Sequence, residues 1–69
     1  MMPAYHLVTD AGFIREFWRR LHEMRGADPS ISQEAVFELL NEEYFAVFHE
    51  YKFSSFDAFR KRRDRASTK

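Results

Sequence analysis

The stretch Thr9–Arg25, TDAGFIREFWRRLHEMR, decides the fold class of this chain. Its apolar side chains recur at helical spacing and share one arc of a helical wheel: Phe13, Ile14, Phe17, Trp18, Leu21 and Met24. Charged residues fill the opposite arc, where Glu16 and Arg20 have the spacing of an i,i+4 ion pair. The pattern predicts an amphipathic helix over residues 9–25, with Thr9 as N-cap and Gly26 as its end.

Two further helices are predicted downstream, over residues 32–51 and 54–66. The second helix has two possible N-caps, Ser32 or Ser30, the latter in a capping box with Gln33, and Ser54 is the expected N-cap of the third. A serine side chain at this position can accept a hydrogen bond from the first turn of a helix. The apolar arc of the second helix is Val36, Phe37, Leu40, Tyr44, Val47, Phe48 and Tyr51. With residues 1–8 as an extended leader, the expected fold over residues 1–69 is a single all-α domain, a small three-helix bundle in an orthogonal or up-down arrangement.

The composition indicates how so short a chain builds a core. It has 69 residues and no cysteine, which excludes disulfides and thiolate metal sites, but it has eight Phe, three Tyr and one Trp. Aromatic rings bury large apolar areas, so we expect Trp18, Leu21, Leu40 and Phe48 to be nearly buried. No apolar run is long enough to span a membrane, and the start does not resemble a signal peptide. The expected location is the cytoplasm.

Charge is distributed unevenly along the chain. Residues 1–51 carry four Arg against nine Asp and Glu, whereas residues 52–69 carry seven Lys and Arg against two Asp. The last predicted helix therefore carries a basic run, Arg60-Lys61-Arg62-Arg63 followed by Arg65. Such a run is typical of phosphate contacts with nucleic acid. The alternative is a solvated basic tail that pairs with the acids of the second helix.

Two functions follow from these features. In the first, a helix-turn-helix-like arrangement binds DNA without sequence preference: Arg60, Lys61, Arg62 and Arg65 contact phosphates, and Ser55 lies at the base-reading end of the last helix. In the second, the chain is a protein-interaction module or a homodimer with no nucleic-acid role. Phe45 on the polar side of the second helix, together with Leu39, would then form the partner interface.

Nothing in the sequence predicts catalysis. There is no cysteine nucleophile and no glycine-rich phosphate loop, and a domain of this size has little room for a pocket of roughly 300 Å³. Glu38, Glu42 and His49 share a face, but the histidine is spaced wrongly to complete a metal site with either glutamate. We therefore expect no enzyme activity, no cofactor and no metal.

The segment Tyr51–Arg60 carries a resemblance. Its pattern of aromatic-Lys-aromatic-Ser-Ser-aromatic-Asp-x-Phe-Arg resembles small helical proteins of unknown function encoded in bacterial genomes, including prophages and other mobile elements. The resemblance implies a helical fold and a bacterial or phage origin. It implies no activity that could be transferred to particular residues.

Overall fold

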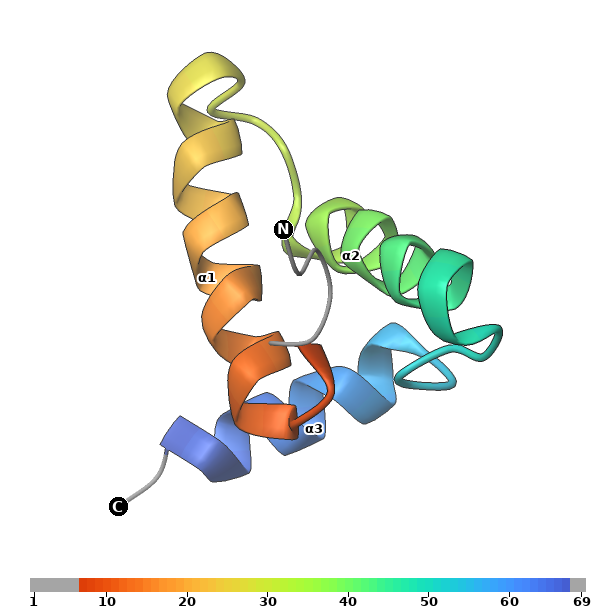
Figure 1. Ribbon diagram of the computed structural model, residues 1–69. Coiled ribbons are helices and arrows are strands. Elements are labelled where there is room, and N and C mark those ends of the chain that lie inside the picture. Colours follow the sequence, from red (N-terminus) through yellow and green to blue (C-terminus); the bar gives the residue numbers. More distant parts are fainter. Residues whose placement is uncertain (1–6, 68–69) are drawn as a thin grey trace.

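The computed structural model describes residues 7–67, with side chains for residues 7–65. Over that range the chain forms three helices and no strand: α1 (Asp10–Ala27), α2 (Gln33–Phe48) and α3 (Phe56–Ser67). Figure 1 shows α3 running across the foot of α1 and below α2, so that the helices cross one another. The expected all-α three-helix fold is confirmed, in a crossing rather than an up-down arrangement.

The helix starts are set by side-chain caps. The Thr9 hydroxyl accepts a hydrogen bond from the Gly12 amide at 3.0 Å, and the Ser32 hydroxyl accepts one from the Ala35 amide at 3.1 Å. The predicted Thr9 cap is therefore confirmed, and of the two alternatives for α2 the cap is Ser32, not Ser30. The third cap is wrong by one residue, because Ser55, not Ser54, accepts from the Ala58 amide at 3.1 Å.

Two predicted helix ends are also wrong. Gly26 does not end α1, which continues to Ala27. The φ of Gly26 is not positive, so this glycine does not adopt the left-handed conformation that often terminates a helix. The second helix ends at Phe48, short of the predicted residue 51. His49 adopts a left-handed conformation with φ of 62°, and its amide donates to the Phe45 carbonyl at 2.8 Å. A non-glycine residue can therefore terminate this helix, which the sequence pattern did not indicate.

All three helices contribute to one aromatic core. Its buried members are Leu7, Phe13, Ile14, Phe17, Leu21, Val36, Phe37, Leu40, Tyr44 and Phe59. Phe59 of α3 is completely buried, and its ring centroid lies 4.8 Å from that of Phe17 and 4.9 Å from that of Phe37. The burial of Leu7 attaches the end of the leader to the core; residues 1–6 of the predicted leader lie outside the described residues.

Several expected core positions lie at the surface instead. Leu21 and Leu40 are buried as predicted, but Trp18 is 41% exposed and Phe48 is only half-buried. The Trp18 ring lies beside α3, with the guanidinium of Arg63 over it at 5.6 Å from the ring centroid. Val47 and Tyr51 are also exposed. Tyr51 lies beyond the end of α2 and so cannot continue its predicted apolar arc, whereas Val47 is exposed within the helix.

Glu16 shows that a residue on the polar arc of α1 can be buried. Its carboxylate is 2.7 Å from a guanidinium nitrogen of Arg19 and 2.7 Å from one of Arg20, which confirms the predicted i,i+4 pair with Arg20. Hydrogen bonds from Arg19 and Arg20 and the charges of both arginines lower the pKa of Glu16 to about 2, although burial alone would raise it. Arg20 also donates to both carboxylate oxygens of Glu43 at 2.8 Å, so the cluster joins α1 to α2.

Candidate protein-binding groove

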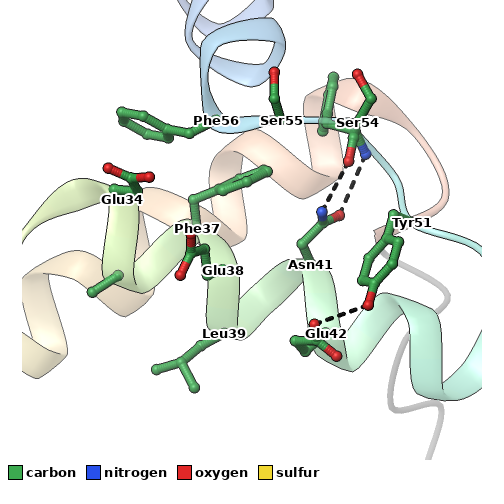
Figure 2. Close-up of a pocket in the computed structure, with 12 residues that line it drawn as sticks. Glu34, Phe37, Glu38, Leu39, Asn41, Glu42, Tyr51, Ser54, Ser55 and Phe56 are labelled. Carbon is green, nitrogen blue, oxygen red and sulfur yellow. Dashed lines mark hydrogen bonds between the residues drawn. The ribbon is translucent and has the colours of Figure 1, made fainter.

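A groove runs between the outer side of α2 and the segment that leads into α3 (Figure 2). It has a volume of about 710 Å³ and is shallow and open to solvent. Its lining residues are Glu34, Ala35, Phe37, Glu38, Leu39, Asn41, Glu42, Tyr51, Phe53, Ser54, Ser55 and Phe56. We call this feature the acidic groove. The expectation that the domain has little room for a pocket is wrong, because a groove remains between α2 and residues 51–56, where the chain turns into α3.

The charges of the acidic groove all have one sign. Among its described lining residues, Glu34, Glu38 and Glu42 are acidic and none is Lys, Arg or His. The three glutamates follow one another at four-residue spacing, so they form a stripe along α2. Tyr51 donates from its hydroxyl to the Glu42 carboxylate at 3.0 Å, and this bond raises the pKa of Tyr51. Apolar walls beside the stripe come from Leu39, Phe53 and Phe56.

Asn41 fixes the wall of the groove opposite α2. This buried amide accepts hydrogen bonds at Oδ1 from the backbone amides of Lys52 at 2.9 Å and Phe53 at 3.3 Å. Its Nδ2 donates to the Phe53 carbonyl at 2.9 Å (Figure 2). The connection between α2 and α3 is thereby held against α2 by one side chain. The sequence places Asn41 beside the apolar arc of α2, and a polar residue at that position was the signal that could have indicated this role.

The two predicted interface residues lie at the acidic groove. Leu39 is 48% exposed and lines the groove directly. Phe45 is 39% exposed, and its ring stacks on that of Tyr51 with centroids 4.6 Å apart. Because Tyr51 also lines the groove, both predicted residues border the same surface. Their role in binding a partner stays a prediction.

The basic run of α3 is largely engaged with carboxylates of the same chain. Arg60 pairs with Asp57, and Lys61 also approaches Asp57 at 3.4 Å. Arg62 donates to Asp10 of α1 at 2.7 Å, and this bond is the main reason that the pKa of the Asp10 carboxyl is lowered. The ion pairs described for Arg60, Lys61 and Arg62 therefore involve α3 itself and α1, whereas the tail alternative expected the acids of α2.

Within this run, Arg63 packs between α3 and the other two helices. It donates to the Gln33 side chain of α2, pairs with Asp64 at 3.0 Å and lies over the ring of Trp18. Lys61 and Arg65 point outward instead; the Lys61 side chain is 77% exposed, and Arg65 is exposed. We call Lys61 and Arg65, four residues apart on the outer face of α3, the basic stripe.

The start of α3 differs from the recognition helix of a helix-turn-helix protein. There the second helix follows a turn of roughly three to four residues, and its N-terminal end contacts the bases. Here the connection runs from His49 to Ser55, and Ser54 and Ser55 line the groove opposite Glu34 and Glu38. The Ser55 hydroxyl already caps α3. Carboxylates at this end of α3 would repel a phosphate backbone.

Comparison of the chain with protein-family models, with curated protein sequences and with solved structures gives no match. Within the described residues, no helix is both long enough and apolar enough to cross a membrane. The same part of the chain contains no group of three His, Asp or Glu side chains that could hold a metal ion.

Proposed function

We propose that this chain is a protein-interaction module that binds a positively charged, partly apolar polypeptide segment in the acidic groove. The observation that carries the proposal is the lining of the groove, where three glutamates and no cation lie beside apolar side chains. An open groove suits a polypeptide better than a small molecule, because pockets for small ligands usually enclose most of the ligand surface. Leu39, Phe53 and Phe56 would contact apolar side chains of the partner.

The glutamate stripe would supply orientation more than affinity. Exposed ion pairs contribute about 0–1 kcal/mol each, whereas aromatic and aliphatic contacts at the centre of an interface contribute more. Glutamates spaced by one helical turn match cations with the same spacing on a helical partner. The preferred segment is therefore an amphipathic helix with Lys or Arg along one edge and Leu or aromatic residues beside it.

The test is a titration of the ¹⁵N-labelled protein with a synthetic amphipathic helical peptide made of Leu and Lys. We expect amide shift changes to concentrate at residues 34–42 and 51–56. The double substitution Glu34→Gln/Glu38→Gln should weaken binding by up to about thirtyfold, since two ion pairs of at most about 1 kcal/mol each are lost. The control Glu23→Gln/Glu50→Gln removes the same charge from exposed positions outside the groove and should bind normally. Shifts elsewhere, or no shifts, would refute the proposal.

A second candidate function, non-specific DNA binding by α3, is favoured by the exposure of Lys61 and Arg65. Arg60 and Arg62 pair with Asp57 and Asp10 more closely than Lys61 approaches Asp57, at 3.4 Å, so we expect two phosphate contacts, from Lys61 and Arg65, rather than more. The slope of log K against log salt for random duplex DNA should then be about −2. Lys61→Gln/Arg65→Gln should abolish binding in a gel-shift assay. Absence of a shift with the unsubstituted protein at low salt would exclude this function.

A further inference from the structure

The chain itself carries a segment that matches the chemistry of the acidic groove. The groove stripe of Glu34, Glu38 and Glu42 repeats every four residues along α2, and the basic stripe of Lys61 and Arg65 has the same spacing along α3. Four residues of helix advance about 6 Å, so the two stripes have the same step. Both stripes are exposed, and their charges are opposite.

The basic stripe belongs to a different part of the molecule from its own groove. The α3 residue that lines the groove is Phe56, in the first turn, whereas Arg65 lies about 14 Å further along the same helix. A straight helix cannot fold back on its own first turn. Arg65 therefore cannot lie along the acidic groove of its own molecule, and any such groove that it meets must belong to another molecule.

Long-range electrostatics do not oppose such an encounter. The chain carries 11 Lys and Arg against 11 Asp and Glu, so two copies have no net repulsion. The opposed charges of its two halves favour an orientation in which the acidic side of one copy meets the basic helix of the other. A protein with a net charge near zero also associates more readily than a highly charged one.

We propose that the segment bound in the acidic groove is α3 of a second copy of this chain, with Lys61 and Arg65 of one molecule lying along Glu34, Glu38 and Glu42 of another. This inference rests on the proposed function of the groove and names its partner. The aliphatic stems of Lys61 and Arg65 would cover Leu39 and Phe56 while their charged ends meet the carboxylates. Self-association of this kind weakens as salt rises, because the paired charges are exposed.

The test reverses the charges of each stripe in turn and measures the association state of the variants by sedimentation velocity, at millimolar protein concentration and low salt. The unsubstituted protein should associate beyond the monomer. Glu34→Lys/Glu38→Lys and Lys61→Glu/Arg65→Glu should each be monomeric alone, because like charges then meet at the contact. An equimolar mixture of the two variants should associate again, since each supplies the stripe that complements the other. Glu23→Lys/Glu50→Lys changes the net charge of the chain by as much as Glu34→Lys/Glu38→Lys does, but outside the groove, and should still associate.

Folding of the variants is checked by circular dichroism. Lys61→Glu places a carboxylate near Asp57, so Arg65→Glu alone serves as a second variant if α3 loses helix content; it should still weaken association several-fold. A monomeric unsubstituted protein, or a mixture that stays monomeric, would overturn the inference. If the Leu-Lys peptide nevertheless binds in the acidic groove, the proposed function stands with a foreign partner. If duplex DNA binds the basic stripe of that monomer, the stripe serves nucleic acid and the inference fails.

Discussion

Glu16 is a single residue whose environment predicts a pH dependence of stability. Its pKa is lowered from 4.5 to about 2, chiefly by hydrogen bonds from Arg19 and Arg20. The ionised form is therefore favoured in the folded state, and its stabilisation is complete above pH 4.5 and is lost as the pH falls toward 2. The shift sets an upper limit of about 3 kcal/mol, reduced in practice because Arg19 is exposed.

Glu16→Gln should therefore lower stability near neutral pH and flatten the acid part of the curve of unfolding free energy against pH. Urea denaturation at a series of pH values measures this. Glu23→Gln is the control, because Glu23 is exposed and approaches Arg19 only at 3.8 Å. Some acid sensitivity should remain in both variants, since the carboxyls of Asp10 and Asp57 also have lowered pKa values. Equal curves for the two variants would contradict the assignment.

The left-handed backbone conformation of His49 leads to a second prediction at the scale of a single residue. His49 is the only non-glycine residue of the described chain with positive φ, and it terminates α2. Glycine adopts this conformation without the steric cost that a side chain incurs. His49→Gly should raise the free energy of unfolding by about 0.5–1 kcal/mol. His22→Gly, in the exposed interior of α1, should lower it by about 1 kcal/mol. Thermal denaturation distinguishes the opposite signs.

At the scale of elements, one side chain holds the connection between α2 and α3. Asn41 satisfies the amides of Lys52 and Phe53 and the carbonyl of Phe53 from a buried position. Asn41→Ala leaves these groups without that partner, so we expect a loss of about 2–3 kcal/mol. Amide hydrogen exchange at Lys52 and Phe53 should accelerate well before exchange within α1. The exposed neighbour Glu38, replaced by Ala, should leave both rates unchanged.

The elements also show which parts of the fold a sequence pattern can predict. Thr9 and Ser32 were identifiable because capping depends on a side chain and the amide three residues later, which is local information. The choice between Ser54 and Ser55 was not local, because Asn41 holds Phe53 and so sets where the connection meets α3. The acidic groove was missed for the same reason: its glutamates were visible on α2, but its other wall comes from residues 51–56.

At the scale of the whole molecule, the core depends most on the ring of Phe59. This residue is completely buried among rings from α1, α2 and the connection. Phe59→Ala should cost about 3–5 kcal/mol, enough to unfold much of a domain this small. Phe48 is only half-buried, and its ring centroid lies 4.5 Å from that of Tyr44. Phe48→Ala should therefore lower the free energy of unfolding by only about 1–2 kcal/mol. Urea midpoints in the reverse order would contradict this description of the core.

Helical periodicity identified most of this core but ranked its members incorrectly. The wheel of the first helix places Trp18 beside Phe17, and a pattern based on hydrophobicity treats the two alike. Packing distinguishes them, because Phe17 contacts Phe59, whereas Trp18 meets the charged end of Arg63. Glu16 shows the opposite error, since two arginines bury a carboxylate that the pattern assigns to solvent. Specific side-chain contacts decide these cases: a contact with α3 for Trp18, and ion pairs within α1 for Glu16.

The position of Trp18 has a spectroscopic consequence. It is the only tryptophan of the chain, and its indole lies 4.9 Å from the ring of Phe17 and 5.6 Å from the guanidinium of Arg63. Its intrinsic fluorescence is therefore sensitive to the separation of α3 from α1. Detachment of α3 alone would change the emission while most of the far-ultraviolet signal of α1 and α2 persists. The emission of this one natural chromophore, compared with the far-ultraviolet signal, can thus distinguish the opening of a single helix from global unfolding without an added label.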